Sequence, residues 1–190
     1  MSVTVTVEDG TGVSGANSYL STADFEAYAD ARLYSYGANQ DAIASALIRA
    51  TAWIDATYRS RWPGVRTFGA MQSLLWPRKA GSNVNGSFVP DRWTTTVTDA
   101  EGIPIATNEI PKVLKDALAE AAYRELNSPG SLAPDLERGG AIQSLQAGSV
   151  EIVYSSVAPA GTTFTQIDAI LSGLIGAARG SCYTAMVARA

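Results

Sequence analysis

The sequence predicts a mainly α-helical protein: a small bundle of about four helices with short β-strand or hairpin insertions and an extended C-terminal tail. Three observations predict this class. Apolar residues recur at helical spacing in several stretches, Pro-Gly pairs end those stretches, and the β-like runs between them are short. At 190 residues the chain fits one domain that buries a core of its own.

The N-terminal segment combines a strand signal with a helix start. Residues 3–7 alternate Val and Thr, which predicts a strand, and a glycine-rich loop follows up to residue 18. Ser21, with Asp24 three residues later, resembles a capping box that opens a helix. Apolar residues at helical spacing then carry the expected helix as far as Leu33.

The middle of the chain contains the clearest helix. Residues 43–58 follow the i, i+4, i+7 pattern over about four turns and end before a Pro-Gly pair. Residues 64–110 are irregular, and 81–93 predicts an exposed polar loop. Apolar residues on both sides of Gly102 predict a small hairpin there.

The C-terminal part begins with a third helix. Pro111 suits its first turn, and the helix is expected to end near residues 127–130. Two short β-like runs lie within 142–155, and apolar residues at helical spacing predict a last helix over 167–175.

The expected organisation is one domain and a tail. We predict a single domain over residues 1–179, with an exposed insertion at about 80–106. Residues 180–190 are nearly uncharged and too few to form a core alone, so we predict a tail that docks on another chain.

The absence of histidine excludes several kinds of chemistry. Ser-His-Asp and Cys-His catalysis need an imidazole, and zinc sites of His and Cys need both residue types. Cys182 is the single cysteine and forms no disulfide within the chain. Glu120, among alanines, is expected to be partly buried, but no second acid accompanies it. We expect no enzyme and no cofactor. Without a signal peptide or a run long enough to span a membrane, the chain is expected to fold in a cytoplasm.

Charge is unevenly distributed along the chain. The formal net charge is −4, which argues against a general nucleic-acid coat. Residues 49–79 hold six basic residues and one acid, whereas residues 8–41 hold six acids and one arginine. This polarity suits copies that meet head to tail, basic on acidic, although ordinary solvated surface explains it as well.

The sequence GTGVSG at residues 10–15 matches the glycine pattern of dinucleotide-binding loops. In such sites a helix begins within the glycines, and its amides face a pyrophosphate. Here the next helix is expected only near Ser21, and Glu8 and Asp9 would place negative charge beside the phosphates. A loop without a nucleotide is therefore favoured.

Basic and aromatic residues alternate between residues 53 and 78. Three interpretations stay open: core residues covered by arginine stems, anchors of a protein interface, or a stacking surface for single-stranded DNA. The candidate interface residues are Arg59, Arg61, Trp62, Arg66, Trp76 and Arg78, with Tyr183 in the tail.

The order of several motifs resembles a family of tailed-phage proteins. The motifs are VEDGTG at 7–12, ANSYLS at 16–21, ALIRAT at 46–51, YRSRW at 58–62, LWPR at 75–78, DAEGIP at 99–104, EIP at 109–111 and GSVE at 148–151. The sequence is similar to head-tail connector (adaptor, or head-completion) proteins, a family that is also often labelled DnaT-like and single-stranded-DNA-binding.

The resemblance implies a mostly helical subunit of the virion neck. Such subunits form a ring, usually of about twelve copies, beneath the portal protein, and join it to a downstream tail or stopper protein. Viral double-stranded DNA passes through the lumen without sequence-specific binding. The alternative is a single-stranded-DNA-binding replication protein of the primosome type. Neither role implies a membrane partner.

Overall fold

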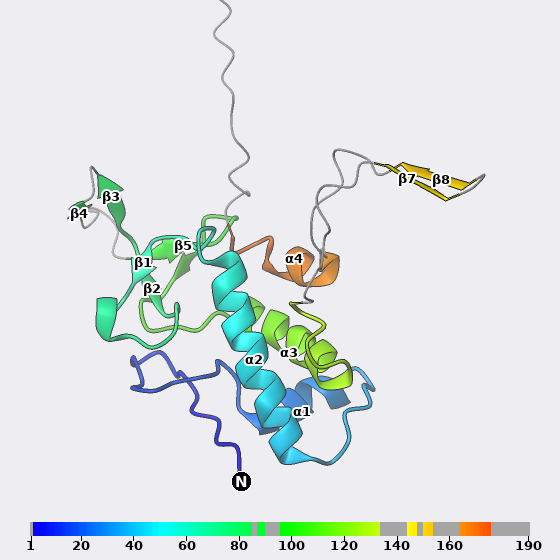
Figure 1. Cartoon of the computed structure of the whole chain (residues 1–190). Coiled ribbons are helices and arrows are strands. Elements are labelled where there is room, and N and C mark those ends of the chain that lie inside the picture. The colour runs from blue at the N-terminus through cyan, green and yellow to red at the C-terminus, as the bar shows by residue number, and fades with distance from the viewer. Residues whose placement is uncertain are drawn as a thin grey trace, which may run out of the picture.

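The computed structural model describes residues 2–84, 87–89, 96–133, 144–147, 150–153 and 164–175. Within these residues the chain forms a mainly helical fold, as the periodicity predicts (Figure 1). Its helices are α1 (Thr22–Asp30), α2 (Gln40–Tyr58), α3 (Lys112–Asn127) and α4 (Thr165–Leu171), with the 3₁₀ turn η1 (Gly69–Met71).

The described strands form two-stranded antiparallel sheets. They are β1 (Val65–Arg66) with β2 (Arg78–Lys79), β3 (Ser82–Val84) with β4 (Ser87–Val89), β5 (Val97–Thr98) with β6 (Pro104–Ile105), and β7 (Ser144–Ala147) with β8 (Val150–Val153). The predicted hairpin around Gly102 and the two β-like runs within 142–155 are confirmed.

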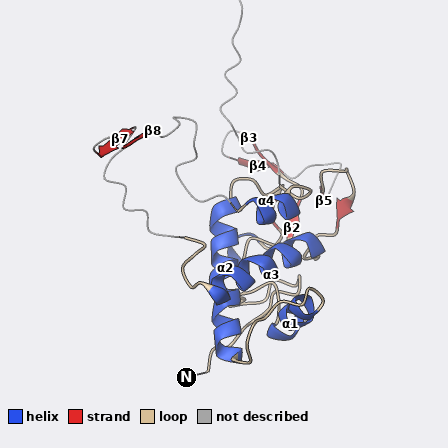
Figure 2. Cartoon of the chain, turned by 90° about the vertical axis from the view of Figure 1, so that its right-hand side faces the viewer, coloured by secondary structure: helices blue, strands red, loops and turns tan. Residues whose placement is uncertain are grey.

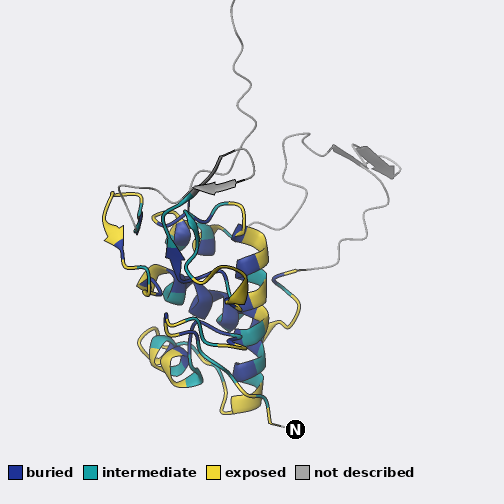
Figure 3. Ribbon diagram, turned by 90° about the vertical axis from the view of Figure 1, so that its left-hand side faces the viewer, coloured by how far each residue is buried: buried dark blue, intermediate teal, exposed yellow. Residues whose placement is uncertain are grey.

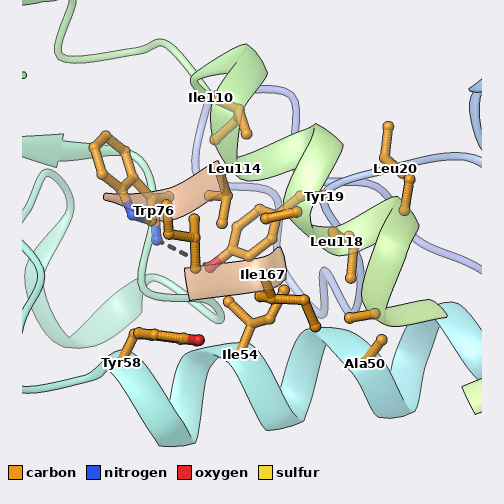
Figure 4. Packing of buried hydrophobic residues seen from close by; sticks show 14 of the residues in the cluster. Tyr19, Leu20, Ala50, Ile54, Tyr58, Trp76, Ile110, Leu114, Leu118 and Ile167 are labelled. Atoms are coloured by element: carbon orange, nitrogen blue, oxygen red, sulfur yellow. Dashed lines mark hydrogen bonds between the residues drawn. The ribbon is translucent and has the colours of Figure 1, made fainter. Parts of the chain in front are cut away.

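The core lies where α2, α3 and α4 meet. Ile54 of α2 faces Leu114 and Leu118 of α3, and Ile167 of α4 closes the cluster (Figure 4). Alanines on α2 and α3 keep this packing close, because a methyl side chain lets two helix backbones approach. The surface of α2 that points away from this core is exposed (Figure 3).

Helix α1 begins as predicted and ends earlier. The Ser21 side chain accepts a hydrogen bond from the Asp24 amide, and Asp24 bonds back to Ser21, which confirms the capping box. The helix ends at Asp30, however, so the expectation that it reaches Leu33 was wrong. Leu33 has a φ of 57° and is 94% exposed, so the chain has already left the helix there.

Residues 3–7 do not form the predicted strand. The described backbone has a single β-bridge here, between Val7 and Ser18. The Asn17 side chain accepts a hydrogen bond from the Thr6 amide, and the Thr6 carbonyl accepts from the Asn17 amide. These local bonds replace a ladder with a neighbouring strand, so the Val-Thr alternation was misleading.

The segment 80–106 differs in part from the expected exposed insertion. β3 and β4 form a hairpin where a loop was predicted. Val97 and Ile105 lie in the core, so the buried part of this segment starts earlier than the predicted boundary at 106. The tail of residues 180–190, with Cys182 and Tyr183, lies outside the described residues.

A buried polar network ties the N-terminal segment, α2 and the LWPR segment together. The Tyr19 hydroxyl donates to Asp55 at 2.7 Å and accepts from the Leu75 amide. It also accepts from the Trp76 amide, a bond that Figure 4 draws as a dashed line. The other Asp55 oxygen accepts from the Leu75 amide at 3.0 Å. Burial raises the pKa of the Asp55 carboxyl, which the hydrogen bonds from Tyr19 and Leu75 oppose.

The raised pKa of Asp55 predicts a pH-dependent contribution to stability. The folded state binds this proton more tightly than the unfolded chain, so the contribution is largest at low pH. It falls as pH rises from 3.8, the ordinary value, through the raised pKa. We therefore expect the free energy of unfolding of the wild type, minus that of Asp55→Asn, to fall in urea titrations as the pH is raised from about 4 through the raised pKa. A difference that rises over this range would contradict the assignment.

Candidate interaction surfaces

Arg78 is a structural residue of the core. Its guanidinium donates to the carbonyls of Pro63 and Gly64 at 2.5 and 2.6 Å, and to that of Leu75 at 3.1 Å. The residue is buried, and this burial lowers the pKa of its guanidinium to about 10, so it remains a cation at neutral pH. Such a side chain is not available to a phosphate or to a partner chain.

The tryptophans of the candidate set also face inward. Trp62 and Trp76 are buried, and their rings meet edge to face at 5.9 Å. Trp53 is half-buried and packs against Tyr58 and Phe164. Of the three open interpretations, the core one therefore describes Trp62 and Trp76, whose buried rings leave no face on which a DNA base could stack.

The remaining arginines follow α2 in the chain, from its C-cap Arg59 to Arg66 in β1. Arg59 is exposed. Arg61 lies over the Tyr58 ring and forms an ion pair with Asp168 at 3.5 Å. Arg66 donates to the Gln72 carbonyl at 3.0 Å. Of the predicted set, therefore, Arg59 is the cation most open to a partner, and Tyr183 lies outside the described part of the chain.

Four acidic residues and the exposed Arg59 lie at opposite ends of α2. Helix α1, with Asp24, Glu26 and Asp30, packs beside the N-terminal end, where Asp41 is also found (Figure 1). Arg59 lies at the other end, with β1 and β2 beside it (Figure 1). A helix of 19 residues separates these ends by about 28 Å. The fold thus converts a charge pattern along the sequence into an acidic end and a basic end, which also complements the helix dipole.

Sequence reasoning missed an exposed apolar feature, which we call the apolar tip (residues 68–71). Met71 is 86% exposed and Phe68 is 42% exposed. The tip is held firmly: the buried Gln72 side chain accepts from the Phe68 amide and donates to the carbonyls of Leu74 and Pro77. Periodicity assigns apolar residues to the interior and offers no signal for one that a rigid turn holds in solvent.

The glycine-rich loop supports this tip. A Cβ on Gly12, whose φ is 78°, would lie 2.6 Å from the Phe68 ring. The Gly15 amide donates to the Ser73 hydroxyl, and Glu8 accepts from the amides of Gly10 and Gly12. The glycines thus let the backbone pass close to Phe68, and the carboxylate of Glu8 occupies the amides that would hold a phosphate. No helix begins in this loop, since the next helix starts at Thr22.

A groove on the other side of α2 is built by α3, α4 and the segment after α1. We call it the tyrosine groove. It has a volume of about 470 Å³, and its lining includes Tyr34, Glu120, Tyr123, Arg124, Ser128 and Phe164. The rings of Tyr34 and Tyr123 stack at 4.2 Å, and Arg124 lies over Phe164 at 5.9 Å. An adjoining hollow continues the groove past Arg32 and Ile170.

Glu120 forms the floor of the groove. It was expected to be partly buried and is 3% exposed. The hydroxyls of Tyr28 and Tyr34 donate to one of its oxygens, and the Arg32 guanidinium lies 3.8 Å away. These hydrogen bonds raise the pKa of both tyrosines, together with burial, which is the larger cause. With one carboxylate and two arginines, the groove carries an excess of positive charge.

Other kinds of site were sought among the described residues. No group of three or more acidic or cysteine side chains there gathers closely enough to hold a metal ion. No helix in that part of the chain is long and apolar enough to cross a membrane.

The fold and these surfaces define a mainly helical protein with an acidic end, a basic end, a rigid apolar tip and an aromatic groove. The chain belongs to the family described as "Putative DnaT-like ssDNA binding protein", whose family model matches residues 3–190. No curated protein and no solved structure matches the chain. The sequence motifs indicated a family that is often labelled DnaT-like, and the family match confirms that label.

The structural role of Arg78 can be tested against Arg59. Arg78→Ala removes three hydrogen bonds made by a buried side chain, so we expect a loss of about 3 kcal/mol in the free energy of unfolding. Arg59→Ala, at an exposed site, is expected to change it by less than about 0.5 kcal/mol. Urea unfolding followed by tryptophan fluorescence measures both. Equal effects would show that Arg78 is not a core residue.

The support of the tip can be tested with two glycines. Gly12 and Gly15 both have positive φ, but nothing lies within 4 Å of a Cβ on Gly15. Gly15→Ala is expected to cost about 1 kcal/mol from backbone strain alone, and Gly12→Ala about 1–2 kcal/mol more, because its methyl group displaces the Phe68 ring. Urea unfolding of both variants gives the difference. A cost for Gly12→Ala no greater than that for Gly15→Ala would refute the packing role.

Proposed function

We propose that this protein is a head-tail connector of a tailed-phage virion. It forms a ring under the portal protein, extends the DNA channel and joins the head to the tail. It is made in the host cytoplasm and acts in the virion neck. The proposal assigns no catalytic step and no cofactor.

The observation that carries the proposal is the charge separation along α2. An adaptor must present different surfaces to the components on its two sides, and this subunit has an acidic end and a basic end. A charged fraction of only 17% further favours a protein that covers much of its surface with other chains.

The proposal also accounts for DNA passage. A lumen that grips phosphates through a continuous basic lining would hold DNA rather than let it slide. The net charge of −4 per subunit is compatible with a lining that does not grip phosphates. Arg78 binds a carbonyl of its own chain, which is compatible with such a lining as well.

The second candidate is a single-stranded-DNA-binding protein, which the family description favours. The tryptophans first considered for stacking are buried, so the aromatic groove with Arg124 would have to bind the bases instead. This candidate predicts salt-dependent affinity for oligonucleotides that is lost in Tyr123→Ala.

One pair of measurements separates the candidates. Negative-stain microscopy of the protein mixed with its portal protein is expected to show rings on the portal. A fluorescence titration with single-stranded oligonucleotides is expected to show negligible binding. Tight, salt-dependent oligonucleotide binding without any association with portal would favour the replication role and sink the connector proposal.

The basic end can be tested within the same assay. Arg59→Glu reverses an exposed charge, so we expect ring assembly on the portal to fall at least about tenfold at low salt. Lys112→Glu is the matched control, because Lys112 is exposed on α3 and, within the described part of the chain, its ion pair is with Asp116 of its own helix. Equal assembly of both variants would mean that the basic end of α2 is not an interface.

A further inference from the structure

The apolar tip has the properties of a preformed binding element. Met71 is 86% exposed, yet the turn that carries it is fixed by Gln72 and by the packing of Phe68 on Gly12. A rigid apolar side chain loses little conformational entropy when it binds, and the polarizable sulfur of methionine packs well against aromatic rings. The tip therefore suits an aromatic hollow on another chain.

The tyrosine groove is such a hollow, and it lies on the opposite side of the subunit. In Figure 1, η1 is to the left of α2, whereas the C-terminal end of α3 is to the right; in Figure 2 the right-hand side, with α3, faces the viewer. A tip cannot reach the groove of its own subunit across the core. It can reach the groove of a second copy, which makes the contact heterologous.

Three features of the groove indicate that it is incomplete in one subunit. Arg124 Nε is buried and has no hydrogen-bond partner among the described residues. Leu33, between the groove residues Arg32 and Tyr34, is 94% exposed with a φ of 57°, an unfavourable conformation for leucine. The groove also carries two arginines against one carboxylate.

The tip side supplies the complementary charge. The exposed carboxylate of Asp9 belongs to the loop on which Phe68 packs. Hydrogen bonds from the side chain and the amide of Thr11 lower the pKa of Asp9, so it is an anion at neutral pH. Asp9 thus places a negative charge on the loop that packs against the tip, and the groove carries two arginines against one carboxylate.

We propose that the apolar tip of one copy, centred on Met71, inserts into the tyrosine groove of the next copy. This inference rests on the connector proposal and deepens it, because it names the contact that joins neighbouring subunits. Repeated from copy to copy, a contact between different surfaces gives a ring if the rotation closes.

Thiol cross-linking tests this contact directly. Met71→Cys marks the tip, and Asn127→Cys marks the groove, where the exposed Asn127 belongs to the lining. Both are made with Cys182→Ser, since Cys182 is the single natural cysteine. With a short bis-maleimide, we expect the double variant to give a ladder of covalent multimers, because η1 and the C-terminal end of α3, which carry the two thiols, lie on opposite sides of one subunit (Figure 1).

Mixtures provide the control. The two single-cysteine variants mixed together are expected to yield one cross-linked heterodimer, and each alone to yield none. Adding Ser128→Trp to the groove variant should fill the groove and reduce the heterodimer at least about tenfold, since Ser128 is exposed on its rim. Light scattering of the wild type, alone and with portal, establishes whether copies associate.

The outcomes are distinct. Homodimers of the Met71→Cys variant would indicate contact between two tips and overturn the inference. Association of the wild type without any bridge between positions 71 and 127 would overturn the inference while leaving the connector proposal standing. If the wild type fails to associate even with its portal protein, the connector proposal and the inference fail together.

Discussion

The burial of Asp55 is the constraint on which the rest of the structure depends. A carboxylate in the core needs hydrogen-bond donors, and Tyr19 and the Leu75 amide supply them from two other segments of the chain. The N-terminal segment and the LWPR segment must therefore both reach α2 before the core can close. Arg78 then places a positive charge nearby and occupies the carbonyls of the turn after α2. These charged and aromatic residues thus connect the three segments inside the core. Apolar contacts alone would specify the arrangement of the segments less uniquely.

The same connection determines which surfaces stay outside. The network holds Leu75 and Arg78 in place, just after residues 68–72, which turn back over the glycine-rich loop. Gln72 points inward and donates to the carbonyls of Leu74 and Pro77. Met71 is then directed into solvent, where no residue of the described chain covers it. The tip lies next to the buried network, and its rigidity comes from the Gln72 hydrogen bonds and from the packing of Phe68 on Gly12.

Local patterns predicted the parts of the fold that local interactions determine. The capping box at Ser21, the span of α2 and the hairpin around Gly102 depend on residues close in sequence, and the structure confirms them. The strand prediction for residues 3–7 was wrong because a strand needs a partner strand. Here the Asn17 side chain accepts the hydrogen bond of the Thr6 amide instead. The site was harder to predict. The Arg-Trp alternation left a core and two binding interpretations open. Contacts with remote segments bury Arg78 and Trp76, and Glu120 meets Tyr28 across 92 residues.

The proposed contacts act in two directions, and their combination has a consequence for assembly. The tip and the groove lie on opposite sides of α2, whereas the acidic and basic ends lie along it. In a cyclic ring every copy has the same orientation relative to the axis. If copies join side to side through tip and groove, all basic ends repeat on one rim and all acidic ends on the other. A weak charge difference in one subunit then becomes a strong one over the whole ring. The two rims differ in sign without any additional component, which is what an adaptor between two different partners requires.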